Sequence, residues 1–149
     1  MEKTKVDDMD LKLISVLQKN SRLSSTTIAK KVGVSTPTII KKIERLEAKG
    51  IIEKFTIMLD HHKLGYKVIA RVAMNILPSE LKRVADLLKK EECLYEIWHM
   101  GGAHNLIAGA RFKEVENLQK FTIEKLSKLP GIQSYEISIV LDVVKTTSP

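Results

Sequence analysis

The chain has 149 residues, of which 44% are hydrophobic and 29% are charged, and its formal net charge is +7. This length allows one ordinary domain or two small ones, and the composition predicts a packed, soluble core. No apolar run approaches the roughly 20 residues of a membrane span, and the charged first ten residues are unlike a signal peptide. The lone Cys93 excludes an internal disulfide, and no Cys/His cluster has zinc spacing. We therefore expect a cytoplasmic protein without metal or cofactor.

Positive charge is concentrated in one short part of the chain. Residues 21–50 contain seven Lys or Arg and only two acids, a local net charge of +5. Residues 61–149 contain thirteen Lys or Arg and ten acids, which leaves +3 over about three times the length. A basic cluster of this kind indicates an anionic partner such as nucleic acid.

The first 50 residues predict a helix-turn-helix. An Asp pair precedes a helix that runs to about Gln18, and a Ser pair precedes a second, shorter helix. The "GVS" tripeptide then predicts a tight turn, because Gly33 suits a positive φ. A third helix over residues 36–49 begins after the N-cap Ser35 and ends before Gly50. In this pattern the helix after the turn lies in the major groove of DNA.

The third predicted helix has two unlike sides. At about 100° per residue, one side is an apolar stripe made of Ile39, Ile40, Ile43 and Leu46. The other side carries Lys and Arg that can neutralise phosphates or reach guanine edges. Thr38 and Lys42 have no evident structural need, so we expect them to contact DNA, whereas capping is the stronger interpretation for Ser35. Arg22, between the first two helices, contacts the DNA backbone or stays solvated. The candidate DNA-contacting residues are Arg22, Ser35, Thr36, Thr38, Lys41, Lys42, Arg45 and Lys49.

The rest of the chain alternates between strand and helix patterns. The segment "IIEKFTIMLD" (51–60) favours a strand, and "HHKLG" after it is the best candidate boundary between two domains. The later elements are a strand in 66–77, a helix that Ser79 caps and that runs to about residue 90, strands in 93–100 and 105–112, a helix over 114–129 and a strand in 132–144. This βαββαβ order is the ferredoxin-like plan.

We therefore predict an α+β protein in three parts. A helix-turn-helix domain, winged-helix-like, spans residues 1–51, a linker strand and hinge span 52–65, and a ferredoxin-like domain spans 66–149. Helices should cover one face of its sheet. The other face is expected to carry Ile69, Ala73, Tyr135 and Ile137, which is too apolar for water, so a second copy should cover it.

A symmetric dimer has consequences for the DNA site. It predicts a palindromic operator whose half-sites lie about 10 base pairs, or a multiple of that, apart. The linker strand is expected to pair with its dimer mate and so to set this spacing.

Four segments of the chain carry a family resemblance. They are "DDMDLKLISVLQKNSRLS", "IAKKVGVSTPTIIKKIERLEAKGII", "LDHHKLG" and "LPGIQSYEISIVLDVVK". In this order and spacing, and over almost the whole chain, they resemble the Lrp/AsnC (feast/famine) family of transcription regulators. The resemblance implies sequence-specific binding to double-stranded DNA, homodimers that often assemble into octamers, and a small effector, frequently an amino acid, bound between dimers.

The resemblance also implies where an effector would bind. Family members carry a Gly-x-x-Asp loop between the two middle strands, and here Gly102 stands at the glycine and Asn105 at the aspartate. The family's Thr-x-Thr positions on the last strand are Tyr135 and Ile137 here. The pocket is thus less acidic than the pattern, and an altered ligand and no amino-acid effector at all both remain open. The candidate effector residues are Gly101, Gly102, His104, Asn105, Tyr135 and Ile137.

Several of these residues also have ordinary structural interpretations. Gly101 and Gly102 suit a hairpin turn, and His104 suits a solvated loop. Asparagine keeps a hydrogen-bonding carbonyl but lacks the charge that pairs with an ammonium group. Asn105→Asp is therefore expected to strengthen amino-acid binding, unless burial of the acid reverses the sign.

A second hypothesis starts from the ferredoxin-like half alone. That fold also hosts enzymes and metabolic regulatory proteins. The sequence contains no nucleophile, base and oxyanion constellation, and the basic first 50 residues would have no role in such a protein. We therefore expect a transcription regulator rather than an enzyme.

Overall fold

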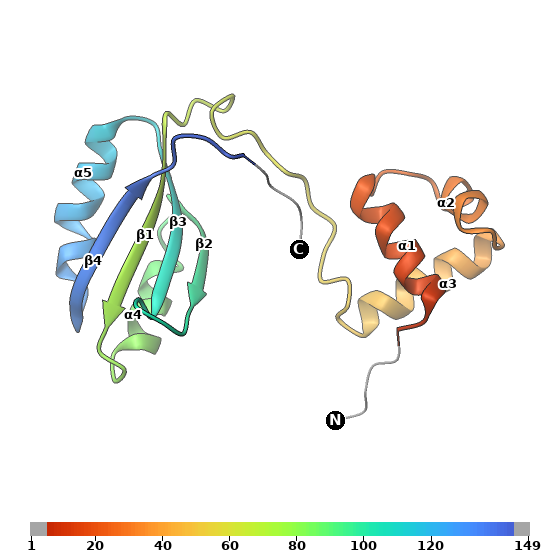
Figure 1. The fold of residues 1–149 in the computed structure, drawn as a ribbon, viewed down its shortest axis with the longest axis horizontal. Coiled ribbons are helices and arrows are strands. Elements are labelled where there is room, and N and C mark those ends of the chain that lie inside the picture. The colour runs from red at the N-terminus through yellow and green to blue at the C-terminus, as the bar shows by residue number, and fades with distance from the viewer. Residues whose placement is uncertain (1–5, 145–149) are drawn as a thin grey trace. The chain divides into compact units, whose positions relative to one another are not determined.

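The computed structural model describes residues 6–144, which form two compact units that divide between Met58 and Leu59. The first unit contains the helices α1 (Asp8–Lys19), α2 (Ser25–Val32) and α3 (Thr36–Ala48). The second contains, in chain order, β1 (Val68–Ile76), α4 (Leu81–Leu88), β2 (Leu94–His99), β3 (Leu106–Phe112), α5 (Val115–Glu124), a 3-10 turn (Leu126–Lys128) and β4 (Ile132–Ile139) (Figure 1).

Local capping determines where the first helices begin. The carboxylate of Asp7 accepts a hydrogen bond from the backbone N–H of Asp10 at 2.7 Å, and the carboxylate of Asp10 accepts one from the backbone N–H of Asp7 at 3.1 Å. Ser24 Oγ accepts the N–H of Thr27 at 3.2 Å, and Gly33 ends α2 with a φ of 88°. The sequence prediction of a helix, a second helix, a tight turn and a third helix is confirmed.

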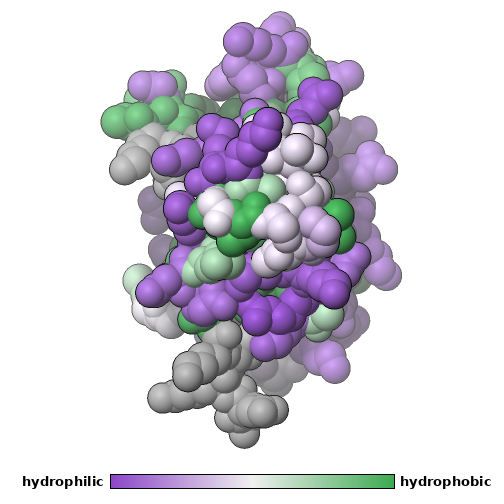
Figure 2. Space-filling model, turned by 90° about the vertical axis from the view of Figure 1, so that its right-hand side faces the viewer, coloured by the Kyte–Doolittle hydropathy of each residue, from purple (hydrophilic) through white to green (hydrophobic). Residues whose placement is uncertain are grey.

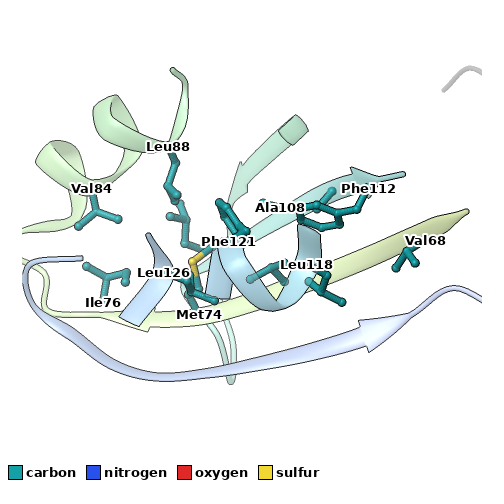
Figure 3. Close-up of a cluster of buried hydrophobic side chains, with 13 residues drawn as sticks. Val68, Met74, Ile76, Val84, Leu88, Ala108, Phe112, Leu118, Phe121 and Leu126 are labelled. Atoms are coloured by element: carbon teal, nitrogen blue, oxygen red, sulfur yellow. The ribbon is translucent and has the colours of Figure 1, made fainter. Parts of the chain in front are cut away.

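The second unit is a sheet with helices on one face. Its strand order in the described part is β2-β3-β1-β4, and all neighbouring strands are antiparallel. Alternate residues of β1, among them Met74 and Ile76, point toward the helices and pack in one cluster with Val84 of α4 and Phe121 of α5 (Figure 3). The predicted ferredoxin-like plan is therefore confirmed.

Each unit has its own hydrophobic cluster. In the first unit Leu13, Ile39 and Leu46 have no exposed surface, and Ile28 is almost completely buried. Figure 2 shows a face of the molecule on which hydrophilic side chains predominate around smaller hydrophobic areas. Within residues 6–144, no helix is long and apolar enough to cross a membrane.

The predicted strand over residues 51–60 is not formed. These residues pair with no other strand of the described chain, although the segment is rich in strand-forming side chains. Phe55, Ile57 and Met58 are instead exposed, by 48%, 72% and 67%. A strand needs a hydrogen-bonding neighbour, and alternating sequence alone does not supply one.

Three predicted boundaries are also wrong. The helix expected to start after Ser79 begins at Leu81, and the helix expected over residues 114–129 ends at Glu124 before a separate 3-10 turn. The last strand ends at Ile139 rather than continuing to residue 144. The β1–β4 ladder ends at the pair Ala70–Ile139, and the N–H of Val140 donates one further bond to the Ile69 carbonyl. In this register residues 142–144 would lie beyond the start of β1 at Val68.

The face expected for Tyr135 and Ile137 is wrong as well. In the β1–β4 ladder Tyr135 lies opposite Met74 and Ile137 opposite Val72, and directly opposed residues share a face. Both side chains therefore lie on the helix-covered side. Ser134, Glu136 and Ser138 take the open face instead, which is consequently more polar than predicted.

Candidate functional site

The turn and the start of α3 form a compact, self-capped unit. Ser35 Oγ accepts the backbone N–H of Thr38 at 3.3 Å and lies 2.7 Å from the hydroxyl of Thr38. Pro37 occupies the first turn of α3, where its missing N–H costs nothing. Capping, the stronger interpretation for Ser35, is confirmed, and Thr38 takes part in it.

The buried side of α3 fixes which residues point outward. Ile39 and Leu46 are fully buried against α1 and α2. Residues on the opposite side are exposed, and they include Pro37, Lys41 and Glu44. The helix therefore presents a defined outer surface to whatever it binds.

Two of the basic residues of α3 are held by α1. Lys42 Nζ donates to Asp10 at 2.8 Å and to Asp7 at 2.9 Å, and Arg45 donates to Asp10. Asp10 has no exposed surface, and the Lys42 side chain is only 14% exposed. The expectation that Thr38 and Lys42 have no structural need is therefore wrong.

These contacts shift the pKa values of the groups that make them. Burial raises the pKa of Asp10, but hydrogen bonds from Lys42 and from the Asp7 backbone, together with the charges of Lys42 and Arg45, outweigh burial and hold it below its ordinary value. The hydrogen bond from Lys42 also lowers the pKa of Asp7. The pKa of Lys42 is raised, chiefly by its hydrogen bond to Asp10. All three groups are therefore charged at neutral pH.

Other basic residues of the first unit remain free to bind an anion. Their side chains are exposed and make no ion pair with any residue in the range 6–144; those near the turn and α3 are Arg22, Lys30, Lys31, Lys41 and Lys49. Lys30 and Lys31, on α2, were not among the candidates drawn from the sequence. The sequence could have indicated them, because both lysines lie in the last helical turn of α2, directly before the loop that leads into α3.

In the predicted effector loop, Asn105 binds the protein backbone instead of being free for a ligand. Gly102 has a φ of 135°, which suits the hairpin-turn interpretation. The side chain of Asn105 binds the end of β1: its Oδ1 accepts the N–H of Ile76 at 3.0 Å, and its Nδ2 donates to the Ile76 carbonyl at 2.7 Å. Both ends of the amide are thus occupied by backbone, so Asn105 supports the loop.

A shallow hollow lies beside this loop on the open face of the sheet. His104 borders it, with Nε2 3.7 Å from Glu136 Oε2. The guanidinium of Arg71, 4.7 Å above the Trp98 ring, borders it as well. Its lining is Arg71, Ala73, Trp98, Met100, His104, Ile107, Glu136 and Ser138.

The hollow includes His104 but not the other predicted effector residues. Tyr135 and Ile137 lie on the opposite face of the sheet, so the structure does not bring the predicted set together. Within residues 6–144, no group of three or more His, Cys, Asp or Glu could hold a metal ion.

Comparison with known proteins identifies matches to both units. A family model described as winged helix-turn-helix DNA-binding matches residues 6–53, and one described as the Lrp/AsnC ligand binding domain matches residues 67–149. The HTH-type transcriptional regulator LrpA of Pyrococcus horikoshii is 32% identical over 140 residues, which cover 94% of this chain and 99% of that protein. The HTH-type transcriptional regulator Ptr1 of Methanocaldococcus jannaschii is 30% identical over 143 residues, which cover 96% and 97%.

Solved structures share the fold at lower sequence identity. A transcriptional regulator of Neisseria meningitidis, solved as a complex with L-Met, matches with a TM-score of 0.90 and 22% identity, over 97% of this chain and 95% of that one. AsnC of E. coli matches with a TM-score of 0.88 and 24% identity, over 97% and 98%.

Proposed function

Because the chain belongs to the Lrp/AsnC family and is a DNA-binding transcription regulator with a ligand-binding domain, we propose that α3 enters the major groove of its operator. The observation that carries this proposal is the exposed outer surface of α3 opposite a fully buried stripe. Lys41 is exposed there without an ion pair in the described chain, and Lys49 is exposed at the helix end. Such cations neutralise phosphates or donate to guanine edges.

The remaining predicted contacts take two different roles in this proposal. Arg22, Lys30 and Lys31 contact the phosphate backbone beside the groove. Lys42 and Arg45 act mainly by fixing the orientation of α3, because Asp10 holds both of them. Thr36 and the Ser35–Thr38 pair stay close to the DNA at the helix N-terminus, where backbone N–H groups favour a phosphate.

Lys41→Ala tests the placement of α3. We expect the affinity for operator DNA to fall by about 1–3 kcal/mol if Lys41 reaches a base, with the fold unchanged because the side chain is exposed. The matched control is Lys19→Ala, which removes an exposed lysine from the last turn of α1. A quantitative footprint on the protein's own promoter region measures both, and equal affinities for the two variants would contradict the proposal.

The assembly that we propose is a homodimer that associates further, into an octamer. The exposed linker residues Phe55, Ile57 and Leu59 support it, because extended apolar chain without a neighbour is a template for pairing with a second copy. Trp98 and Met100 on the open sheet face are 38% and 43% exposed and add apolar area there. In this proposal residues 1–51 bind DNA, residues 52–65 form the linker between the domains, and residues 66–149 form the effector-binding and oligomerisation domain.

Ile57→Asp tests the role of the linker in assembly. Burying an aspartate between two copies is costly, so we expect the variant to dissociate at protein concentrations at which the wild type stays assembled. Sedimentation velocity measures the change, with the exposed α1 residue in Leu11→Asp as control. A wild type that sediments as a monomer would contradict the proposed assembly.

We also propose that the regulator acts in the cytoplasm and senses an amino acid or another small metabolite. The match to a ligand-binding domain supports this, as does the L-Met bound to the Neisseria meningitidis regulator. Calorimetric titration of the twenty amino acids into the full chain tests it. Absence of binding by all twenty would exclude an amino-acid effector.

A further inference from the structure

A strip of four exposed residues lies on the N-terminal part of the outer surface of α3. Pro37, Ile40, Lys41 and Glu44 follow the i, i+3, i+4, i+7 spacing of one helix face, and all four are exposed. The strip lies opposite the buried stripe of the same helix. If α3 enters the major groove, base edges meet these side chains first.

Contacts within the first unit further reduce the number of side chains on α3 that can read bases. Lys42 and Arg45 are bound to the buried carboxylate of Asp10, and Thr38 is hydrogen-bonded to Ser35. Within the strip, Lys41 and Glu44 offer charge, whereas Pro37 and Ile40 offer only apolar surface. Ile40 is therefore the one large aliphatic side chain on the strip. It is 43% exposed, so its predicted place in the buried apolar stripe is wrong.

An exposed isoleucine on this strip matches one feature of DNA. The C5 methyl group of thymine is the apolar group that a base pair presents in the major groove, and side-chain carbon contacts recognise it. We infer that Ile40 packs against a thymine methyl group in each half-site and is a specificity-determining residue of this regulator. This inference rests on the proposal that α3 enters the major groove.

The position of Ile40 suits such a contact. Its neighbour Ile39 is completely buried, so the backbone beneath Ile40 is anchored in the core of the unit. The bonds from Lys42 and Arg45 to Asp10 hold the helix from the side. A short, β-branched side chain on an anchored helix loses little rotamer freedom when it binds.

Deoxyuridine isolates the methyl group, because it differs from thymidine only by lacking the C5 methyl. Operator duplexes are first selected from random DNA with the wild-type chain. Each thymine of a half-site is then replaced singly by deoxyuridine. We expect one position per half-site at which wild-type affinity falls about fourfold, the factor for burial of one methyl group. Ile40→Ala, which removes the contact in both half-sites of the dimer, should bind the unmodified duplex about sixteenfold more weakly and lose nothing further at that position.

Two controls keep this test specific. Leu11→Ala removes an exposed aliphatic side chain from α1 and should keep the full methyl dependence. Circular dichroism melts of both variants should match the wild type, because neither side chain is buried. The inference is overturned if the wild type tolerates deoxyuridine at every position, or if Ile40→Ala keeps the same loss. A wild type that selects no DNA would overturn the placement of α3 itself, and this inference with it.

Discussion

Asp10 is a carboxylate without exposed surface that binds two basic residues of α3. Removing one partner of a buried ion pair leaves the others uncompensated, so such residues cost more to lose than surface pairs do. In this chain the ion pairs of Asp10 with Lys42 and Arg45 also join α1 to α3. The stability of the first unit and the orientation of α3 therefore depend on the same carboxylate.

The pKa of Asp10 predicts an acid-sensitive first unit. Because this pKa is held below its ordinary value of 3.8, its stabilisation is fully present above that pH and is lost as the pH falls through the folded value. Because the pKa of Lys42 is raised above 10.5, the stabilisation that Lys42 contributes is lost only when the pH rises above that value. We expect the free energy of unfolding to fall below about pH 4, as measured by urea unfolding of the full chain followed by circular dichroism.

Asp10→Asn isolates this contribution. At pH 7 the variant should lose about 3 kcal/mol of stability, the lower limit for breaking a buried pair, and its stability should vary less with pH below 4. Asp8→Asn, at an exposed position in the same first turn, should cost less than about 1 kcal/mol and keep the wild-type pH profile. Identical profiles for all three proteins would refute the assignment.

Asn105 is the second residue whose role the structure changes. Asn105→Asp would keep an acceptor for the N–H of Ile76 but would turn an oxygen toward the Ile76 carbonyl, where the amide now donates at 2.7 Å. We expect the variant to lose about 2 kcal/mol of stability in urea unfolding, the cost of an unpaired buried polar group. The predicted gain in amino-acid affinity requires a free side chain, which Asn105 is not.

Gln133→Glu is the matched control for this change. It makes the same amide-to-acid change at an exposed position of β4 and should alter stability by less than about 0.5 kcal/mol. A loss as large as that of Asn105→Asp would mean that added negative charge, rather than the lost hydrogen bond, is responsible.

At the scale of elements, β2 and β3 depend on a glycine for close packing. The ladder between them shifts register between Leu94 and Glu96. A Cβ on Gly109 would lie 2.6 Å from Glu96 Oε1 and 2.7 Å from the Tyr95 ring. Because Gly109 has no side chain, the side chains of Tyr95 and Glu96 can approach β3 this closely. In this position Glu96 binds Arg71.

Gly109→Ala should therefore disturb the open face of the sheet. Overpacking of this size costs about 1–3 kcal/mol, and displacement of Glu96 releases Arg71, which lies over Trp98. Trp98 is the only tryptophan, so its emission spectrum and urea unfolding report both effects. Gly101→Ala, with no atom within 4 Å of its added Cβ, should change neither. An unaltered spectrum in Gly109→Ala would contradict this account.

At the scale of the whole molecule, the DNA site should reflect the symmetry of the proposed dimer. We expect sites selected from random DNA to be palindromic or nearly so, with half-sites about 10 base pairs, or a multiple of that, apart. Sequencing of the selected pool and sedimentation of the complex measure symmetry and stoichiometry together. Sites without a dyad, bound by single copies, would contradict both the dimer and the spacing.

The sequence by itself determined the helix-turn-helix, the βαββαβ order of the second unit and the family. Caps, turns and apolar periodicity act over a few residues, so Ser24, Gly33 and Ser35 could be interpreted without knowing their neighbours in space. The candidate cations of α3 were identified in the same way. The sequence could not show which of these cations are free to bind DNA.

Only the tertiary structure decided which side chains are already occupied. Arg45 and Asp10 are 35 residues apart in sequence, and Asn105 and Ile76 are 29 apart. No local pattern specifies such pairs, because they depend on how α1 crosses α3 and how β3 lies against β1. The β1–β4 register likewise decided that Tyr135 and Ile137 face the helices, since a shift of one residue reverses every side chain of a strand.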